Sequence, residues 1–167
     1  MMKSIMSAND ITLNLIDIND YESYFRIYNQ IENLKYLDFI PFDDVKEAKE
    51  MILKLYFNDL YESYCYKIIY DDKIVGFIDI FNILNHEAEV SFILDLRYQK
   101  QNIMYKSLIL ALNCLKKVEI NKVCAKILEG NLKSINLCKR LGFIEKEKKI
   151  INFKGENQNL ITFYKEL

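Results

Sequence analysis

The stretch that decides the fold is NLKSINLCKRLGF, residues 131–143, which follows a strand-like segment, NKVCAKIL, at residues 121–128. The earlier segment is rich in aliphatic and β-branched residues, and a Glu-Gly pair then breaks the pattern. A helix is predicted over 131–141 because apolar residues recur at helical spacing, and Gly142 follows where many helices end. The expected order is strand, helix, and a return strand from Phe143. The start of such a helix leaves backbone N–H groups free to hold an acceptor atom or an anion.

Length and composition bound the class of protein. With 167 residues and 51% hydrophobic content, the chain is expected to form one compact domain over residues 1–167. No apolar run reaches the length of a membrane span, and the first residues lack the apolar block of a signal peptide, so we expect a cytoplasmic protein. A single histidine, His86, and four cysteines without CxxC spacing argue against a metal site and a serine triad.

Charge is distributed unevenly along the chain. Residues 1–95 hold 18 acidic and 8 basic side chains, a net charge of −10, whereas residues 96–167 hold 6 acidic and 15 basic ones, a net charge of +9. This asymmetry is compatible with an enzyme whose basic part attracts an anionic cofactor and whose acidic part attracts a cationic amine. The alternative is that the charges are simply solvated on the surface. The overall charge of −1 and the lack of a nucleic-acid-binding motif argue against a nucleic-acid partner.

The rest of the chain predicts strands and helices in a mixed arrangement. Strands are expected at 11–17, 62–70, 73–82, 87–95, 121–128, 143–152 and 158–166, and helices at 20–34, 45–58, 102–118 and 131–141. Because residues 87–128 form a strand–helix–strand unit, its two strands should be parallel. The expected fold class is therefore α/β, with a mixed sheet of six to seven strands flanked by about four helices.

Several short motifs together resemble the Gcn5-related N-acetyltransferase (GNAT) superfamily over residues 11–166. The motifs are Ile11-Thr12-Leu13, Val75-Gly76-Phe77, Ala88-Glu89-Val90, Tyr98-Gln99, Asn131 to Phe143, Lys154-Gly155 and Asn159. The resemblance is closest to the branch of ribosomal-protein N-terminal and spermidine N-acetyltransferases. It implies the acyl-CoA N-acyltransferase fold and acetyl-CoA as co-substrate, with no metal. It also implies an amine acceptor, either a small molecule or a protein N-terminus.

The resemblance implies a set of cofactor contacts. The backbone of Phe92, Ile93 and Leu94 would pair with the pantetheine arm, and Asn131 and Ser134 would line the thioester end. The pyrophosphate would face the turn made by Gln99, Lys100, Gln101, Asn102, Ile103, Met104 and Tyr105.

This turn departs from the family pattern, which has small residues where the backbone closes around the phosphates. Asn102 and Met104 stand in place of two of them, and Lys100 in place of a further glycine found in many members. Asn is the best substitute for glycine at positive φ, whereas a methionine at this place would crowd the phosphates and a lysine would attract them. The alternative is a plain helix start without a phosphate role.

Catalytic candidates follow from the same comparison. Members of the family that acetylate polyamines have a tyrosine in the last helix that acts as the general acid. Cys138 occupies the matching position here, and the alternative is that it is a core cysteine. Tyr105 is a substitute proton donor if its side chain reaches the sulfur. Glu89 is the candidate base, acting through water, and also a substrate ligand, unless it is simply a solvated carboxylate. An acidic wall of the acceptor site would be formed by Asp38, Asp43, Asp44 and Glu47. The alternative is helix capping by Asp43 or Asp44.

Two hypotheses of different classes result. The first is an N-acetyltransferase that moves acetyl from acetyl-CoA to a polyamine, an amino sugar or a protein N-terminus by direct transfer. The second is a degenerate, non-catalytic protein of the same fold that binds a CoA species or a protein partner. A homodimer is left open, and neither nucleic acid nor membrane is expected as a partner. A pocket open at residues 99–105 would favour the first hypothesis, and Met104 plugging it would favour the second.

Overall fold

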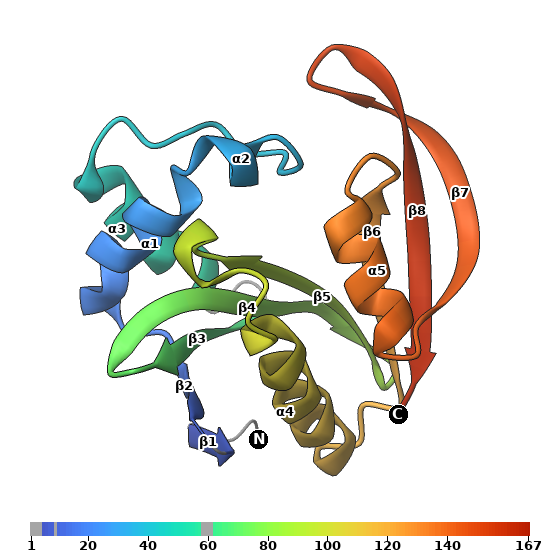
Figure 1. Ribbon diagram of the computed structural model, residues 1–167, viewed down its shortest axis with the longest axis horizontal. Helices are drawn as coiled ribbons and strands as arrows, with labels where there is room; N and C mark the ends of the chain where they lie inside the picture. Colours follow the sequence, from blue (N-terminus) through green and yellow to red (C-terminus); the bar gives the residue numbers. More distant parts are fainter. Residues whose placement is uncertain (1–4, 9, 58–61) are drawn as a thin grey trace.

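The computed structural model describes residues 5–8, 10–57 and 62–167, in which the strands form one eight-stranded mixed sheet (Figure 1). The strands follow the spatial order β1-β2-β3-β4-β5-β6-β8-β7. Their bounds are β1 Ile5–Ala8, β2 Ile11–Leu15, β3 Tyr64–Tyr70, β4 Lys73–Leu84, β5 Glu87–Leu94, β6 Lys122–Leu128, β7 Ile144–Phe153 and β8 Glu156–Glu166. The expected α/β class with a mixed sheet is thus confirmed.

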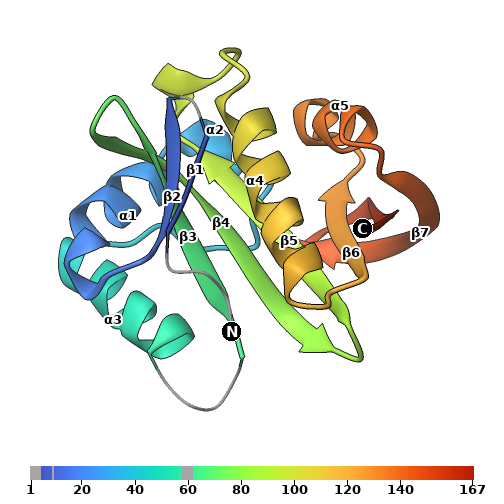
Figure 2. The ribbon, with the colours of Figure 1, turned by 90° about the horizontal axis from the view of Figure 1, so that it is seen from below.

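Helices cover both faces of the sheet. Their bounds are α1 Tyr21–Tyr28, α2 Ile31–Leu34, α3 Val45–Tyr56, α4 Ile103–Lys117 and α5 Leu132–Arg140, with 3-10 turns η1 Ile18–Asp20 and η2 Leu96–Tyr98. Figure 2 shows α1 and α3 side by side on one side of the sheet and α4 on the other. The buried apolar residues accordingly form two cores. The larger core packs α4 and α5 onto the sheet, and the smaller one packs α1 and α3 onto its other face.

The structure corrects the expected element count in two places. β1 adds an eighth strand by pairing antiparallel with β2, and the sequence of this four-residue strand has no clear alternation of apolar and polar residues. The helix expected over 20–34 is divided into α1 and α2, because Gln30 has an extended backbone (ψ 120°). Tertiary hydrogen bonds fix this break. The Asn29 side chain donates to Phe42 O (2.8 Å) and accepts from Phe42 N (3.0 Å). The expected end of the next helix, at residue 58, lies outside the described residues.

The parallel pairing expected between β5 and β6 is confirmed, but it is short. It runs only from Glu87 opposite Lys122 to Glu89 opposite Cys124. Beyond this point β5 continues beside β4 to Leu94, and β6 continues beside β8. The sheet therefore opens between its two central parallel strands, and the candidate site lies at this opening.

Gly76 in β4 is the glycine that this part of the sheet requires. A Cβ atom at this position would lie 2.5 Å from the backbone oxygen of Ile93 and 2.9 Å from a methyl carbon of Leu94. Gly76 therefore lets β4 approach the end of β5 closely.

We expect Gly76→Ala to lower the free energy of unfolding by about 3 kcal/mol, because backbone atoms of β5 must move to relieve the clash. Urea denaturation measures the loss. Gly130→Ala is the matched control, since its Cβ would meet only ordinary contact, at 3.6 Å from Tyr36. Equal stability of the two variants would contradict this account of the sheet.

No helix in the described residues is long and apolar enough to cross a membrane.

Candidate functional site

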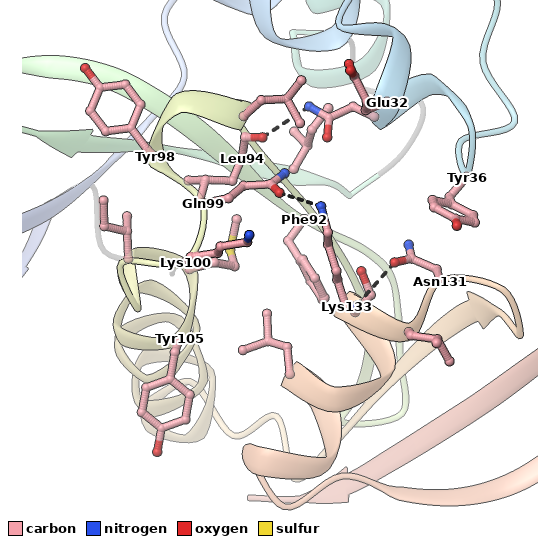
Figure 3. A pocket seen from close by; sticks show the side chains of 18 of the residues that line it. Glu32, Tyr36, Phe92, Leu94, Tyr98, Gln99, Lys100, Tyr105, Asn131 and Lys133 are labelled. Atoms are coloured by element: carbon pink, nitrogen blue, oxygen red, sulfur yellow. Dashed lines mark hydrogen bonds between the residues drawn. The ribbon is translucent and has the colours of Figure 1, made fainter.

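A cavity of about 710 Å³ lies at the opening of the sheet, between β5, the first turns of α4 and α5, and the segment around α2 (Figure 3). It is lined by Glu32, Asn33, Lys35, Tyr36, Leu37, Phe92, Ile93, Leu94, Leu96, Tyr98, Gln99, Lys100, Asn102, Ile103, Met104, Tyr105, Gly130, Asn131, Leu132, Lys133, Ser134, Leu137 and Arg140. Segments far apart in the sequence thus meet at one site. Of the residues expected to hold the cofactor, all except Gln101 line this cavity.

The turn before α4 keeps the conformation that glycine would favour. Lys100 and Asn102 have φ values of 62° and 61°, in the left-handed region. Asn102 is the N-cap residue of α4, and its side chain makes no capping hydrogen bond within the described structure. The first backbone N–H groups of α4, beginning at Ile103, are therefore left for a ligand. The expectation that Asn takes positive φ here is confirmed.

Met104 does not fill the cavity. Its side chain is buried (7% exposed) and belongs to the larger core with Leu108, while one side of it lines the cavity wall. The cavity beside residues 99–105 is therefore open. This is the arrangement expected for the first hypothesis, the N-acetyltransferase.

Because Met104 packs in the core, we expect Met104→Gly to lower the free energy of unfolding by about 3 kcal/mol and to bring no gain in acetyl-CoA affinity. Thermal unfolding and calorimetry measure the two effects. Tighter binding by the variant would show that the methionine obstructs the site.

The cavity carries an excess of positive charge. Among the described lining residues, Lys35, Lys100, Lys133 and Arg140 are basic and Glu32 is acidic. Two of the basic groups hold the α4 turn and α5 together. Lys133 Nζ donates to Gln99 Oε1 at 2.9 Å (Figure 3). Arg140 Nη1 donates to Asn102 Oδ1 at 2.6 Å, and its guanidinium lies 3.8 Å from the centre of the Tyr105 ring. Phosphate groups suit such a set of donors at a helix start.

The N-terminal helices close the other end of the cavity. Asn33 Nδ2 donates to Leu94 O at 3.1 Å, and Tyr36 OH donates to Gly130 O at 3.0 Å. The segment around α2 therefore connects the ends of β5 and β6 across the opening. Sequence reasoning missed it because residues 20–34 were assigned to one continuous helix. Tyr36, just after this helix, is the residue whose side chain could have indicated a contact with the rest of the site.

A buried carboxylate anchors the turn that follows β5. Asp95 is fully buried (0% exposed), accepts hydrogen bonds from Arg97 N (3.0 Å) and Arg97 Nη2 (2.7 Å), and forms an ion pair with Arg26 of α1. Burial opposes ionisation of this group, but the hydrogen bonds from Arg97 and the charge of Arg26 outweigh it and hold the pKa of Asp95 well below its usual range. Asp95 thereby fixes the chain where it enters the cavity wall.

The predicted catalytic residues lie outside the cavity wall. Glu89 is 9% exposed and accepts hydrogen bonds from Lys126 Nζ (2.6 Å) and Asn82 Nδ2 (3.1 Å). Cys138 is 1% exposed in the larger core, and burial raises the pKa of its thiol to about 12. Neither is among the described residues that line the cavity. The hydroxyl of Tyr105 points away from the middle of the cavity (Figure 3). The catalytic roles of Glu89 and Cys138 remain predictions.

The predicted acidic wall also lies elsewhere. Asp38 lines a second, shallower hollow beside Phe39 and Glu47. Asp43 N donates to Glu47 Oε2 at 2.8 Å, and Asp44 Oδ1 accepts from the backbone N–H groups of residues 46 and 47 at 2.7 and 3.1 Å. The helix-capping interpretation is therefore confirmed for Asp44. A substrate role for Asp38 and Asp43 stays a prediction.

The helix expected over 131–141 is present as α5, and Asn131 is its N-cap residue. Asn131 Oδ1 accepts from Ser134 N at 3.2 Å, and both residues line the cavity. In the described part of the chain, no group of three His, Cys, Asp or Glu side chains is placed to hold a metal ion.

An opened mixed sheet with a cationic cavity at a helix start suits an anionic ligand. Residues 10–144 match the family model described as an acetyltransferase (GNAT) domain, and the chain therefore belongs to the GNAT acetyltransferase family. A search of curated protein sequences found no significant match.

Solved structures show the same fold at low sequence identity. RimL, a ribosomal L7/L12 alpha-N-protein acetyltransferase in complex with coenzyme A, superimposes with a TM-score of 0.89 at 17% identity over 98% of each chain. Spermidine N-acetyltransferase from Vibrio cholerae, in complex with CoA and spermine, gives a TM-score of 0.84 at 18% identity over 94% of this chain and 95% of that one. Ribosomal-protein-S5-alanine acetyltransferase from Vibrio fischeri gives 0.83 at 18% identity over 98% and 97%.

Proposed function

We propose that this protein is an N-acetyltransferase that transfers acetyl from acetyl-CoA directly to a primary amine. The observation that carries the proposal is the open cavity at the start of α4, where free backbone N–H groups, Lys100 and Arg140 converge. A diphosphate is the ligand that this set of donors suits, and acetyl-CoA supplies one together with a reactive thioester.

Different residues along the cavity would bind different parts of the cofactor. The turn from Gln99 to Tyr105 would hold the phosphates, with Lys133 moving from Gln99 to a phosphate oxygen. The backbone of Phe92, Ile93 and Leu94 lies where β6 has separated from β5, and this edge would pair with the amides of a pantetheine arm. One acceptor on this edge, Leu94 O, is already bonded to Asn33 Nδ2. Asn131 and Ser134 would border the thioester end.

The acceptor is proposed to be a primary amine: a polyamine, an amino sugar or a protein N-terminus. Two structural neighbours support this range, since one is named for a ribosomal-protein N-terminus and another was solved with spermine. Of the residues predicted from the sequence, Glu89 is the candidate base, acting through water after its pairing with Lys126 loosens. Asp38 and Asp43 would attract the cationic acceptor from the surface.

Release of free CoA thiol from acetyl-CoA tests the proposal. The protein is mixed with spermidine, glucosamine or a peptide with a free N-terminal alanine, and the acetylated product is identified by mass spectrometry. At least one amine should give turnover well above that of protein without amine. Acetyl-CoA binding without turnover on any amine would overturn the transferase.

A non-catalytic protein that binds a CoA species is the second candidate. It is favoured by one observation, that Glu89 and Cys138 both lie outside the cavity wall. Tight binding of acetyl-CoA and of CoA, with no transfer in the same assay, is the result expected of it.

A further inference from the structure

Asp79 is a buried carboxylate that the proposed mechanism does not use. It lies in β4, is 9% exposed, and accepts three hydroxyl hydrogen bonds. The donors are Tyr56 OH at 2.6 Å, Tyr28 OH at 3.0 Å and Ser91 Oγ at 3.1 Å. Within the described structure, no Lys, Arg or His side chain forms an ion pair with it. Asp79 is therefore a buried acid without a cationic partner.

Such a group is costly for a fold unless it is fully hydrogen-bonded, and it attracts any proton or cation that reaches it. The phenols around it stay protonated. Burial raises the pKa of Tyr28 and Tyr56 well above the usual range, and the negative charge of Asp79 adds to this effect. Both phenols are thus fixed as donors to Asp79. Ser91 is the third donor, and its hydroxyl can also accept a hydrogen bond from a ligand.

Ser91 lies beside the opening of the sheet, and neither Ser91 nor Asp79 is among the described residues that line the cavity. Ser91 is half-buried in β5, two residues beyond Glu89, the last residue of β5 that pairs with β6. Its neighbour Phe92 lines the cavity and contacts the larger core, so Ser91 lies on the opposite face of the sheet. Ile93 is on the same face as Ser91 and also lines the cavity, so the cavity reaches that face.

Glu89, on the same face, differs from Asp79 in its surroundings. Its carboxylate is paired with Lys126 Nζ at 2.6 Å. Of these two carboxylates, Glu89 is paired with an ammonium, whereas Asp79 accepts from the hydroxyl of Ser91, which can relay a proton.

We propose that Ser91 binds the acceptor amine and passes its proton to Asp79, so that this pair, in place of Glu89, is the general base of the transfer. This inference rests on the proposed function. The amine nitrogen hydrogen-bonds to Ser91 Oγ and forms a bond to the acetyl carbon. The nitrogen gives its proton to Ser91 Oγ as the serine proton moves to Asp79, and the carbon–sulfur bond breaks. The CoA thiolate leaves with the electron pair and is protonated by water, and Asp79 returns its proton to solvent. Ser91 is the catalytic residue, and Asp79 is a positioning residue that acts through it.

The test compares Ser91→Ala, Asp79→Asn and the double variant with the wild type, using spermidine, glucosamine and the alanine peptide as acceptors. Each single variant should lower kcat about 10- to 100-fold, and the double variant should be no worse than the more impaired single one, because both break one relay. In these variants, the pH at which kcat/KM rises should shift upward, toward the pKa of the free amine at about 10. A merely structural role would change thermal stability without moving this profile.

Two further variants sharpen the comparison. Ser107→Ala also removes a buried serine hydroxyl, one that makes no hydrogen bond in the described structure and does not line the cavity, and it should keep wild-type activity. Glu89→Gln should retain more activity than Asp79→Asn. A larger loss in Glu89→Gln, with the pH profile of Asp79→Asn unchanged, would overturn the proposal.

Amine binding separates failure of this inference from failure of the proposed function. Calorimetry with spermidine, without acetyl-CoA, should show binding that weakens about 3- to 10-fold in Ser91→Ala and Asp79→Asn. If the variants bind spermidine more weakly in this way but the wild type shows no turnover, the amine site would be supported and the proposed transferase activity would be overturned. Wild-type turnover that the two variants retain would overturn the inference alone, and neither binding nor turnover would overturn both.

Discussion

Asp95→Asn is expected to lower the free energy of unfolding by about 3 kcal/mol, one of the largest losses from a single substitution in this chain. The substitution leaves the volume unchanged but removes the charge that pairs with Arg26 and Arg97, and breaking a buried ion pair from one side costs about 3–5 kcal/mol. Urea denaturation at neutral pH measures the loss. Asp10→Asn is the control, because it breaks a solvent-exposed pair with Lys106 and should leave stability unchanged.

The same residue makes stability depend on pH. Since the folded-state pKa of Asp95 lies below its unfolded-state value of about 3.9, its contribution is fully present above that value and is lost as the pH falls through the folded pKa. The wild type should therefore lose stability below about pH 4 more steeply than Asp95→Asn. Parallel pH–stability curves for the two proteins would contradict the assignment.

Arg140→Ala is expected to weaken acetyl-CoA binding about tenfold or more. The guanidinium lies at the start of α4, between Asn102 and Tyr105, where a phosphate would add to its donors and where the turn has no glycines. Loss of a charge-assisted contact to phosphate corresponds to about 1.5–3 kcal/mol. Isothermal calorimetry at fixed ionic strength measures the change.

Lys139→Ala is the matched control for this second prediction. Lys139 is the preceding residue of α5 and is exposed, and it is not among the described lining residues. Its removal should leave the affinity unchanged. Equal losses in Arg140→Ala and Lys139→Ala would indicate a general electrostatic effect rather than a contact in the cavity.

Local sequence patterns predicted the elements whose structure depends on local chemistry. The strand–helix–strand unit from β5 to β6 and the helix α5 depend on residue periodicity and on the glycine that ends α5. The positive φ of Asn102 is likewise a property of its residue type. The residues expected to hold the cofactor were implied by the resemblance to a family, and all of them except Gln101 line one cavity.

Features determined by contacts distant in sequence were not predicted. The break between α1 and α2 depends on hydrogen bonds from Asn29 to Phe42, which no periodicity encodes. Asp79 is a single acid within an apolar strand, and its neighbours Tyr28 and Tyr56 come from two separate helices. An isolated acid in an apolar strand was a usable signal, but its hydroxyl partners appear only once the helices are packed.

Calorimetric titration of the wild-type protein with acetyl-CoA tests the central claim most directly. The cationic cavity at the start of α4 predicts a 1:1 complex with a Kd in the micromolar range, about −8 kcal/mol, that weakens as salt rises. Absence of binding at millimolar acetyl-CoA would contradict it, because the open turn, Lys100 and Arg140 would then hold no phosphate.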